Sequence, residues 1–309
     1  MVESDQMLLI FSSLGTPTNT AIHRYMNQKK VPQFFVLTGA TKWGDPKHFP
    51  WTMGWQANYQ SEARIYATYI LEHHPGGKVG VLYQNDDYGK DYVKGIEDGL
   101  GDKAKSMIVA EAPYETADTT VDSQIVALKA SGADILVDIA TPKFAAQAIR
   151  KVAELGWKPE HILNNPGTSI AAVLRPAGVE NAKGILSTTS AKDPTDPSWN
   201  DDQGVQQWTA FMDKYYPEGD KTDSGTVTGY SIAQTLAQVL KQCDGTLPRE
   251  NVMKQAANLK DLELPMLLPG IRINTSSTDF YPIKQMQMRR FDGEHWELFG
   301  PVITGAVHD

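Results

Sequence analysis

The chain has 309 residues, of which 41% are hydrophobic and 21% charged, and its formal net charge is -8. This balance fits a globular protein long enough for two domains, and the acidic charge argues against a nucleic-acid partner. No apolar run approaches the roughly 20 residues that span a bilayer, which argues against direct insertion in a membrane.

Two strands and a helix are expected in the first forty residues. An apolar run at residues 7–11 predicts a buried strand, Thr16 and Pro17 can start a helix, and a second strand is expected over residues 31–37. The strands end in the loops SSLGT, residues 12–16, and TGAT, residues 38–41. Such loops bind carboxylates and other anions through backbone N–H groups and hydroxyls, but the same residues are also ordinary turn formers. Both interpretations remain open.

An aromatic segment follows at residues 42–59, where Trp43, Trp51 and Trp55 fall within thirteen positions. It is expected either to be irregular and packed by its own aromatic rings, or to form an aromatic wall for a ligand near a domain crossover. A helix over residues 61–72 comes next. His73 and His74 close it, but no third ligand lies at metal spacing.

Residues 78–100 predict a strand, a loop and a helix in succession. Tyr88 lies in the loop at the carboxyl end of the strand, where open α/β sheets bind small molecules. Its ring can stack on a ligand and its hydroxyl can form a hydrogen bond. We expect Tyr88→Ala to weaken ligand binding and to leave the stability of the ligand-free protein nearly unchanged.

Strands and helices alternate as far as residue 189, which predicts a parallel sheet covered on both faces. Strands are expected at residues 106–112, 133–140, 162–163 and 184–189, and helices at 119–130, 143–155 and 167–174. Residues 193–197, DPTDP, indicate a crossover or linker. Three helices follow at 205–216, 226–243 and 250–259, and the chain closes with a hairpin, residues 286–290 and 295–299, around an Asp-Gly turn.

The sequence lacks the short motifs of common catalytic sites. It contains no G-x-S-x-G, no GxxxxGK[ST], no HExxH and no CxxC. The acidic pairs Asp86/Asp87 and Asp193/Asp196 lie in loops, where aspartate is most often a turn former. The sequence therefore predicts a binding protein rather than an enzyme, with no catalytic residue, no metal and no cofactor.

Several motifs occur together in a fixed order: SSLGTPTNTA, KVPQFFVLTGAT, KVGVLYQNDDYGKDYVKGIEDGL, ADILVDIATPKFAAQAIR, AGVENAKGIL, DPTDP and the final hairpin. In these motifs the chain resembles the substrate-binding proteins of ABC importers of the branched-chain amino acid (Leu/Ile/Val-binding) type, which have the type I periplasmic binding protein fold. The resemblance implies an α/β fold of two doubly wound parallel-sheet lobes joined by a three-strand hinge. The first lobe would comprise residues 1–57 and 191–280, and the second 58–190 and 281–309.

The resemblance also implies a ligand site in the cleft between the lobes. The two hydroxyl loops would hold a ligand carboxylate, Tyr88 would cover the ligand, and aromatic residues would line the cleft. The ligand-binding residues predicted in this way are Ser13, Gly15, Thr16, Thr38, Gly39, Thr41, Trp55, Tyr59, Tyr88, Thr141, Pro166 and Gly167.

The sequence departs from the family at the Asn165-Pro166-Gly167 loop, where amino-acid binders place a carboxylate that pairs with the ligand's ammonium group. A buried ammonium without an anionic partner costs several kcal/mol. The predicted ligand is therefore a small carboxylate, aromatic ones included, or a neutral amide, and not a simple α-amino acid.

A second departure is at the amino terminus, which carries neither a signal peptide nor the strand–helix–strand–helix that precedes residues 7–11 in the family. We expect a first lobe that lacks its initial strands and leaves an unpaired edge. The resemblance implies a periplasmic solute-binding component that meets a small-molecule ligand and an ABC transporter permease. The alternative is a cytoplasmic ligand-sensing regulatory protein of the same fold.

Overall fold

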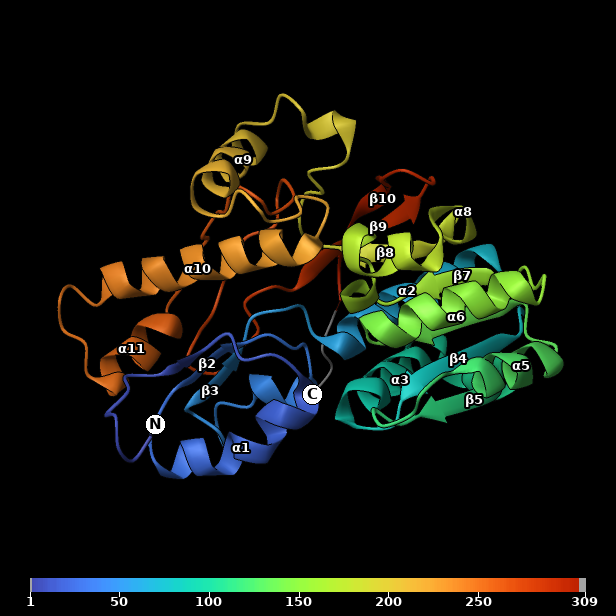
Figure 1. Ribbon diagram of the computed structural model, residues 1–309. Helices are drawn as coiled ribbons and strands as arrows, with labels where there is room; N and C mark the ends of the chain where they lie inside the picture. The colour runs from blue at the N-terminus through green and yellow to red at the C-terminus, as the bar shows by residue number, and fades with distance from the viewer. Residues whose placement is uncertain (1, 306–309) are drawn as a thin grey trace.

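The computed structural model describes residues 2–305, which form two lobes, each built on its own β-sheet (Figure 1). The small-sheet lobe has three parallel strands in the order β1-β2-β3, namely β1 (Ile10–Phe11), β2 (Gln33–Val36) and β3 (Thr52–Gly54). Figure 1 shows α1 below this sheet and α10 above it, with α11 at its side. These helices are α1 (Thr16–Gln28), α10 (Ser224–Gln242) and α11 (Arg249–Ala256).

The first strands differ from the sequence expectation. Only Ile10 and Phe11 of the predicted strand at residues 7–11 pair in the sheet, and β3 lies inside the segment that was expected to be irregular or a ligand wall. Just before β1, the carbonyl oxygens of Met7 and Leu8 accept hydrogen bonds from the guanidinium of Arg249. These backbone groups are therefore satisfied by a side chain of α11 and not by strand pairing.

The large-sheet lobe has seven strands in the order β10-β9-β8-β7-β6-β4-β5. Its first five strands along the chain are parallel, and the terminal hairpin adds two antiparallel strands at one edge. The strands are β4 (Val79–Gln84), β5 (Ile108–Tyr114), β6 (Ile135–Ile139), β7 (Glu160–Leu163), β8 (Leu186–Thr189), β9 (Gln285–Phe291) and β10 (Trp296–Thr304).

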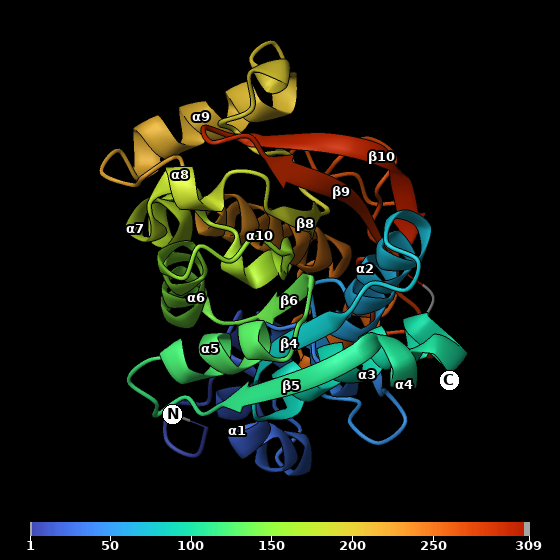
Figure 2. The same cartoon turned by 90° about the vertical axis from the view of Figure 1, so that its right-hand side faces the viewer.

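Helices cover both faces of the large sheet, as the alternating pattern predicted. Figure 2 shows α5 and α6 on one side of β4 and β5, and α2 and α3 on the other. The long helices of this lobe are α2 (Tyr59–His73), α3 (Asp87–Leu100), α5 (Asp122–Ala130) and α6 (Pro142–Glu154), and its short ones are α4 (Ala104–Met107), α7 (Arg175–Ala177) and α8 (Val179–Ala182). Residues 170–174, predicted as a helix end, form a π-helical turn.

The lobes are linked around residues 55–58, 190–192 and 280–284, between the last element of one sheet and the first of the other. Helix α9 (Gln203–Tyr215) lies above α10, away from both sheets (Figure 1). One large apolar core contains side chains of both lobes, including Phe34 and Met53 of the small sheet and Val79 and Leu186 of the large one. Among residues 2–305, no helix combines the length and the apolar character needed to cross a membrane.

Candidate functional site

A pocket lies between the two lobes, beside the segments that link them. Its walls come from residues 55–62, 165–168, 189–194, 224–231 and 286–289, so both lobes and two of the linking segments contribute. We call it the interlobe pocket. It encloses a cavity of about 70 Å³, which has room for several water molecules at ~10–15 Å³ each. Three of the predicted ligand-binding residues line it: Trp55, Tyr59 and Pro166.

Aromatic side chains form one wall of the interlobe pocket. The Trp55 indole is 4% exposed and its Nε1 donates a hydrogen bond to Thr235 Oγ1 on α10 at 3.0 Å. The Tyr59 ring stacks on Tyr92 with centroids 4.7 Å apart, and meets Tyr88 edge-on at 5.2 Å. Burial raises the pKa of Tyr59 to about 12, so its hydroxyl stays protonated and can donate at neutral pH.

Glu62 brings a buried carboxylate to the same pocket. It accepts hydrogen bonds from the hydroxyls of Tyr66 (2.5 Å) and Tyr92 (2.8 Å) and from the backbone N–H of Asn165 (2.7 Å). Burial raises the pKa of Glu62, and these hydrogen bonds oppose the rise. Glu62 lies in α2, so its hydrogen bond from the Asn165 N–H anchors the 165–167 loop to that helix.

Arg289 of β9 supplies a cation to the interlobe pocket. Its side chain is 4% exposed, Nη2 donates to Thr168 Oγ1 at 2.5 Å, and the guanidinium carbon lies 4.5 Å from the centroid of the Trp296 ring. Nε is buried and has no hydrogen-bond partner among residues 2–305. Burial lowers the pKa of Arg289 to about 10, a fall that nearby acids, Asp193 first among them, oppose, so the group is still charged at neutral pH.

The two hydroxyl loops lie where the sequence analysis expected, at the carboxyl ends of β1 and β2, but they do not line the interlobe pocket. Ser13 Oγ donates to Asn19 Oδ1 at 2.5 Å, and the buried hydroxyls of Thr16 and Thr38 form a hydrogen bond with each other at 2.5 Å. Gly15, with φ of 96°, is the residue before α1. In this structure the hydroxyls of Ser13, Thr16 and Thr38 therefore form hydrogen bonds within the protein.

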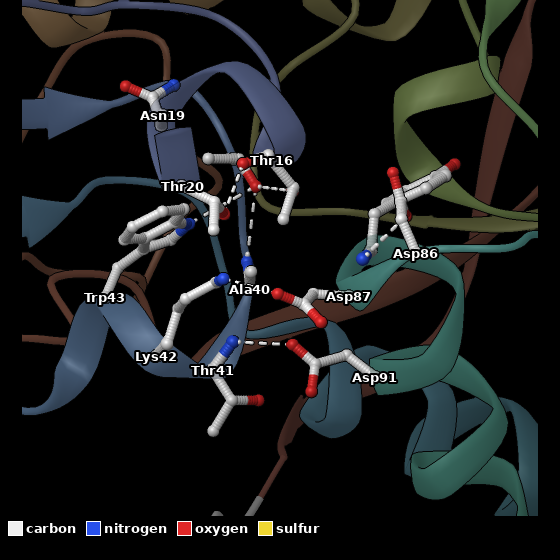
Figure 3. Close-up of polar contacts among 12 residues, drawn as sticks. Thr16, Asn19, Thr20, Ala40, Thr41, Lys42, Trp43, Asp86, Asp87 and Asp91 are labelled. Carbon is white, nitrogen blue, oxygen red and sulfur yellow. Dashed lines mark hydrogen bonds and ion pairs between the residues drawn. The ribbon is translucent and has the colours of Figure 1, made fainter. Parts of the chain in front are cut away.

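Helix α3 of the large-sheet lobe contacts the second hydroxyl loop directly (Figure 3). Asp91 Oδ2 accepts the Thr41 backbone N–H at 2.7 Å, its other oxygen accepts from Gln60, and Lys42 forms an ion pair with Asp87. A carboxylate of the protein thus occupies the backbone donor that the sequence analysis assigned to a ligand carboxylate. We call the contacts of Asp91 and Asp87 with residues 41–42 the α3 bridge.

Tyr88 is packed beneath the aromatic wall and does not line the interlobe pocket. Its side chain is 4% exposed, its ring meets those of Tyr59 and Tyr92, and its hydroxyl is hydrogen-bonded to the side-chain amide of Asn164. The expectation that Tyr88→Ala leaves stability unchanged conflicts with this packing, because the substitution would open a cavity in the core.

The remaining predicted residues hold the backbone near the cleft. A Cβ added to Gly39 would lie 2.2 Å from the carbonyl oxygen of Ala57, so glycine permits the close approach of two segments there. The Thr141 N–H donates to the Tyr114 hydroxyl at 3.0 Å, and the Gly167 N–H donates to Asn164 O at 3.0 Å. None of these three lines the interlobe pocket.

Sequence reasoning missed Glu62, Thr168 and Arg289, all of which line the interlobe pocket. Glu62 lies in a helix and Arg289 in a strand of a hairpin, positions where charged residues usually face solvent. The strand sequence QMQMRRF gives no signal for Arg289, because glutamines alternate with methionines and a second arginine follows.

Two other features resemble sites. Asp292, His295 and Glu297 bring three metal-ligating groups together at the hairpin, but Asp292 caps that turn by accepting the N–H groups of Glu294 and His295. A wider groove, of about 1110 Å³, is lined by four lysines, three of which are paired with aspartates: Lys42, Lys94 and Lys284, with Lys47 the fourth. Both features fit a solvated surface.

Comparison with known proteins gives a consistent family. A family model described as periplasmic binding protein matches residues 1–295. The Leu/Ile/Val-binding protein homolog 7 of Brucella abortus (strain 2308) is 24% identical over 190 residues, which cover 60% of this chain and 45% of that protein. The matched stretch thus spans slightly less than half the length of this curated relative.

Solved structures match nearly the whole chain. The structure of a branched chain amino acid ABC transporter from Thermus thermophilus with bound valine covers 99% of this chain and 80% of its own, with a TM-score of 0.85 and 14% identity. A substrate-binding periplasmic protein from Ralstonia solanacearum covers 98% of this chain and 82% of its own, with a TM-score of 0.82 and 19% identity. A fatty acid ABC transporter substrate-binding protein from Thermomonospora curvata covers 94% of this chain and 73% of its own, with a TM-score of 0.74 and 19% identity. At these identities the likeness concerns the fold, and it confirms the predicted two-lobed α/β class.

Proposed function

The chain belongs to the periplasmic binding protein family, and we propose that it is the solute-binding component of an ABC importer. In this proposal it captures a small organic ligand between its lobes in the periplasm and presents it to a membrane permease, without changing the ligand chemically. The family resemblance and the names of the similar proteins support the proposal.

One observation carries the proposal: the walls of the interlobe pocket come from both lobes and from the segments that link them. A ligand in such a pocket contacts both lobes at once. Its binding therefore favours the arrangement in which the walls are close, and a ligand that binds that arrangement better than an open one shifts the population toward it. A permease can then distinguish loaded from empty protein by shape.

We assign ligand contact first to Trp55, Tyr59 and Pro166, which line the pocket. The hydroxyl loops with Ser13, Gly15, Thr16, Thr38, Gly39 and Thr41, together with Tyr88, Thr141 and Gly167, remain proposed parts of the cleft. For a ligand carboxylate to reach the Thr41 N–H, the α3 bridge has to open, because Asp91 accepts that hydrogen bond here. Tyr88 supports the ligand through Tyr59, whose ring it contacts.

The proposed ligand is a small carboxylate or a neutral amide. The 165–167 loop offers no acid to an ammonium group. Two carboxylates from other segments, Glu62 and Asp193, line the pocket, which the sequence analysis did not foresee. Glu62 accepts three hydrogen bonds from the protein, and Oδ1 of Asp193 accepts the N–H and hydroxyl of Thr195 at 2.9 and 2.7 Å. The lack of an acid in the 165–167 loop is the feature that favours a ligand without an ammonium group.

A thermal-shift screen of the chain against small carboxylates, amides and amino acids tests the function. A ligand that binds only the folded protein stabilises it by mass action, by about 2.7 kcal/mol at a ligand concentration of a hundred times its Kd, and this raises the melting temperature. We expect at least one compound to give a saturable rise and to be recovered unchanged. Recovery of a converted product would instead point to an enzyme.

A further inference from the structure

We infer that Arg289 is an anion-binding group of the interlobe pocket and takes the carboxylate of a small organic ligand. The inference rests on the proposed function only for the place where the ligand lies. It names a group outside the twelve residues assigned from the sequence, on strand β9, which contains none of them.

The first support is burial without a direct ion pair. Arg289 is 4% exposed, and within residues 2–305 neither Asp193 nor Glu62, the nearby acids that oppose the fall of its pKa, forms an ion pair with its guanidinium. Its Nε is buried with no protein acceptor. Burying a charge is costly unless it is paired and hydrogen-bonded, so a guanidinium held in this way in a pocket wall is suited to an anion from outside.

The second support is a rigid mount. Thr168 Oγ1 accepts from Nη2 and itself donates to Asn165 O at 2.7 Å, while the Trp296 ring lies against the guanidinium and its Nε1 donates to Thr168 O at 3.1 Å. The plane of the guanidinium is therefore fixed before a ligand arrives. A planar fork of donors held in one orientation matches the two oxygens of a carboxylate.

The third support is the character of the neighbouring wall. Trp55 and Tyr59 offer aromatic surface in the same pocket as Arg289, and Pro166 adds an apolar edge. A cation next to aromatic and apolar surface fits an organic acid whose hydrophobic body packs on the rings while its carboxylate meets the guanidinium. An inorganic anion would use only the cation.

The facing charges limit what the ligand can carry. Glu62 and Asp193 line the same pocket and Lys192 is paired with Asp202, its Nζ lying 2.7 Å from Oδ1. Arg289 is thus the one cation lining this pocket, within the described residues, that lacks an ion-pair partner. A ligand carboxylate can meet the guanidinium directly, whereas a second negative group on the ligand would face Glu62 or Asp193.

The test is isothermal titration of benzoate and of benzamide, which share a body and differ in charge, into the wild-type chain and Arg289→Met. Charge-assisted hydrogen bonds are the strong ones, so we expect Arg289→Met to weaken benzoate binding at least about tenfold and to leave benzamide within about threefold. Arg289→Lys keeps the charge but loses the planar pair of donors, so its affinity for benzoate should fall between those of the wild type and Arg289→Met.

Arg290→Met is the matched control. Arg290 is the next residue of β9, is exposed, and lies over the Phe299 ring on the opposite face of the strand. The Arg290→Met substitution removes the same charge from the chain without changing the pocket lining, so the variant should bind benzoate as tightly as the wild type does. Circular dichroism and the urea midpoint of each variant establish that it is folded, and Arg289→Lys carries the test if Arg289→Met is not.

Three results would overturn the inference. An equal loss of benzoate affinity in Arg289→Met and Arg290→Met would mean a general charge effect. Equal affinities of Arg289→Met and the wild type for benzoate would mean that the guanidinium does not contact the ligand. Binding of benzamide or another neutral solute, with no binding of benzoate, would leave the proposed function standing and remove the role of Arg289. The failure of every compound in the wider thermal-shift screen would instead count against the function itself.

Discussion

Tyr88 lies just beyond the carboxyl end of β4, as the sequence indicates, and its side chain is buried among aromatic rings. A tyrosine at the carboxyl end of a parallel strand predicts a ligand contact. The structure instead gives the ring two aromatic neighbours and gives the hydroxyl a hydrogen bond to Asn164. The position at the strand end is visible in the sequence. The burial of the side chain depends on its contacts with Tyr59, the first residue of α2, and Tyr92, one turn further along α3.

This packing predicts a large stability effect. Tyr88→Ala should lower the free energy of unfolding by about 3–5 kcal/mol, because it leaves a cavity in the core. Urea unfolding measures the loss. Tyr215→Ala is the control, since that ring is 63% exposed, and it should change stability by less than about 0.5 kcal/mol. Similar midpoints for the two variants would contradict the buried placement of Tyr88.

Among the predicted ligand-binding residues, Trp55, Tyr59 and Pro166 line the interlobe pocket, and their contact with a ligand stays a prediction. Each stands at a sequence landmark, an aromatic cluster or a Pro-Gly turn. Arg289 and Glu62 stand at no landmark. Their burial follows from tertiary partners, the Trp296 ring for one and the hydroxyls of Tyr66 and Tyr92 for the other, and no local pattern encodes those contacts.

At the scale of elements, α3 links the two lobes through the α3 bridge and carries two aspartates with opposite pKa shifts. Burial raises the pKa of Asp91 above its usual value of 3.8, which outweighs the hydrogen bonds from Gln60 and Thr41. Burial would raise the pKa of Asp98 as well, but there the bonds from Lys94 and Arg64 prevail and lower it. The two residues therefore respond to acid in opposite senses.

The pH dependence follows from linkage. A folded-state pKa above the unfolded value means that ionised Asp91 costs stability at neutral pH, and this cost disappears as pH falls through the raised pKa. The wild type should therefore gain stability relative to Asp91→Asn between about pH 7 and about pH 4. Paired urea titrations of the two proteins at several pH values measure this difference.

Asp98→Asn is the matched control on the same helix. A lowered folded-state pKa contributes stability above the unfolded value that is lost as pH falls through the folded one, so the wild type should lose stability relative to Asp98→Asn on acidification. A trend of the same sign for both aspartates would contradict the burial of Asp91 in the α3 bridge.

Most helices and parallel strands were predictable because their apolar periods are long and their ends are marked by Pro, Gly and Asp. Strand β3 was not, since three residues between aromatic and proline neighbours show no alternation. The predicted strand at residues 7–11 was too long for a related reason: an apolar run signals burial, and residues 7–8 are fixed by Arg249 and not by a neighbouring strand.

For the whole molecule, the two-lobed α/β class was predictable from the order of strands and helices together with the resemblance, and the comparisons confirm it. The boundaries at residues 57, 190 and 280 stay a prediction, as does the ligand. Fold class is carried by many weak signals spread along the chain, while ligand choice depends on a few side chains such as Arg289, Glu62 and Asp193 whose meeting only the tertiary structure reveals.

The central claim is that the interlobe pocket binds a small organic carboxylate and not an α-amino acid. Isothermal titration of the chain with leucine and with 4-methylpentanoate, its des-amino analogue, tests it most directly, because the two ligands differ only in the ammonium group. The account predicts that 4-methylpentanoate binds more tightly, since Arg289 can take its carboxylate and the 165–167 loop offers no acid to an ammonium. Tighter binding of leucine would contradict it.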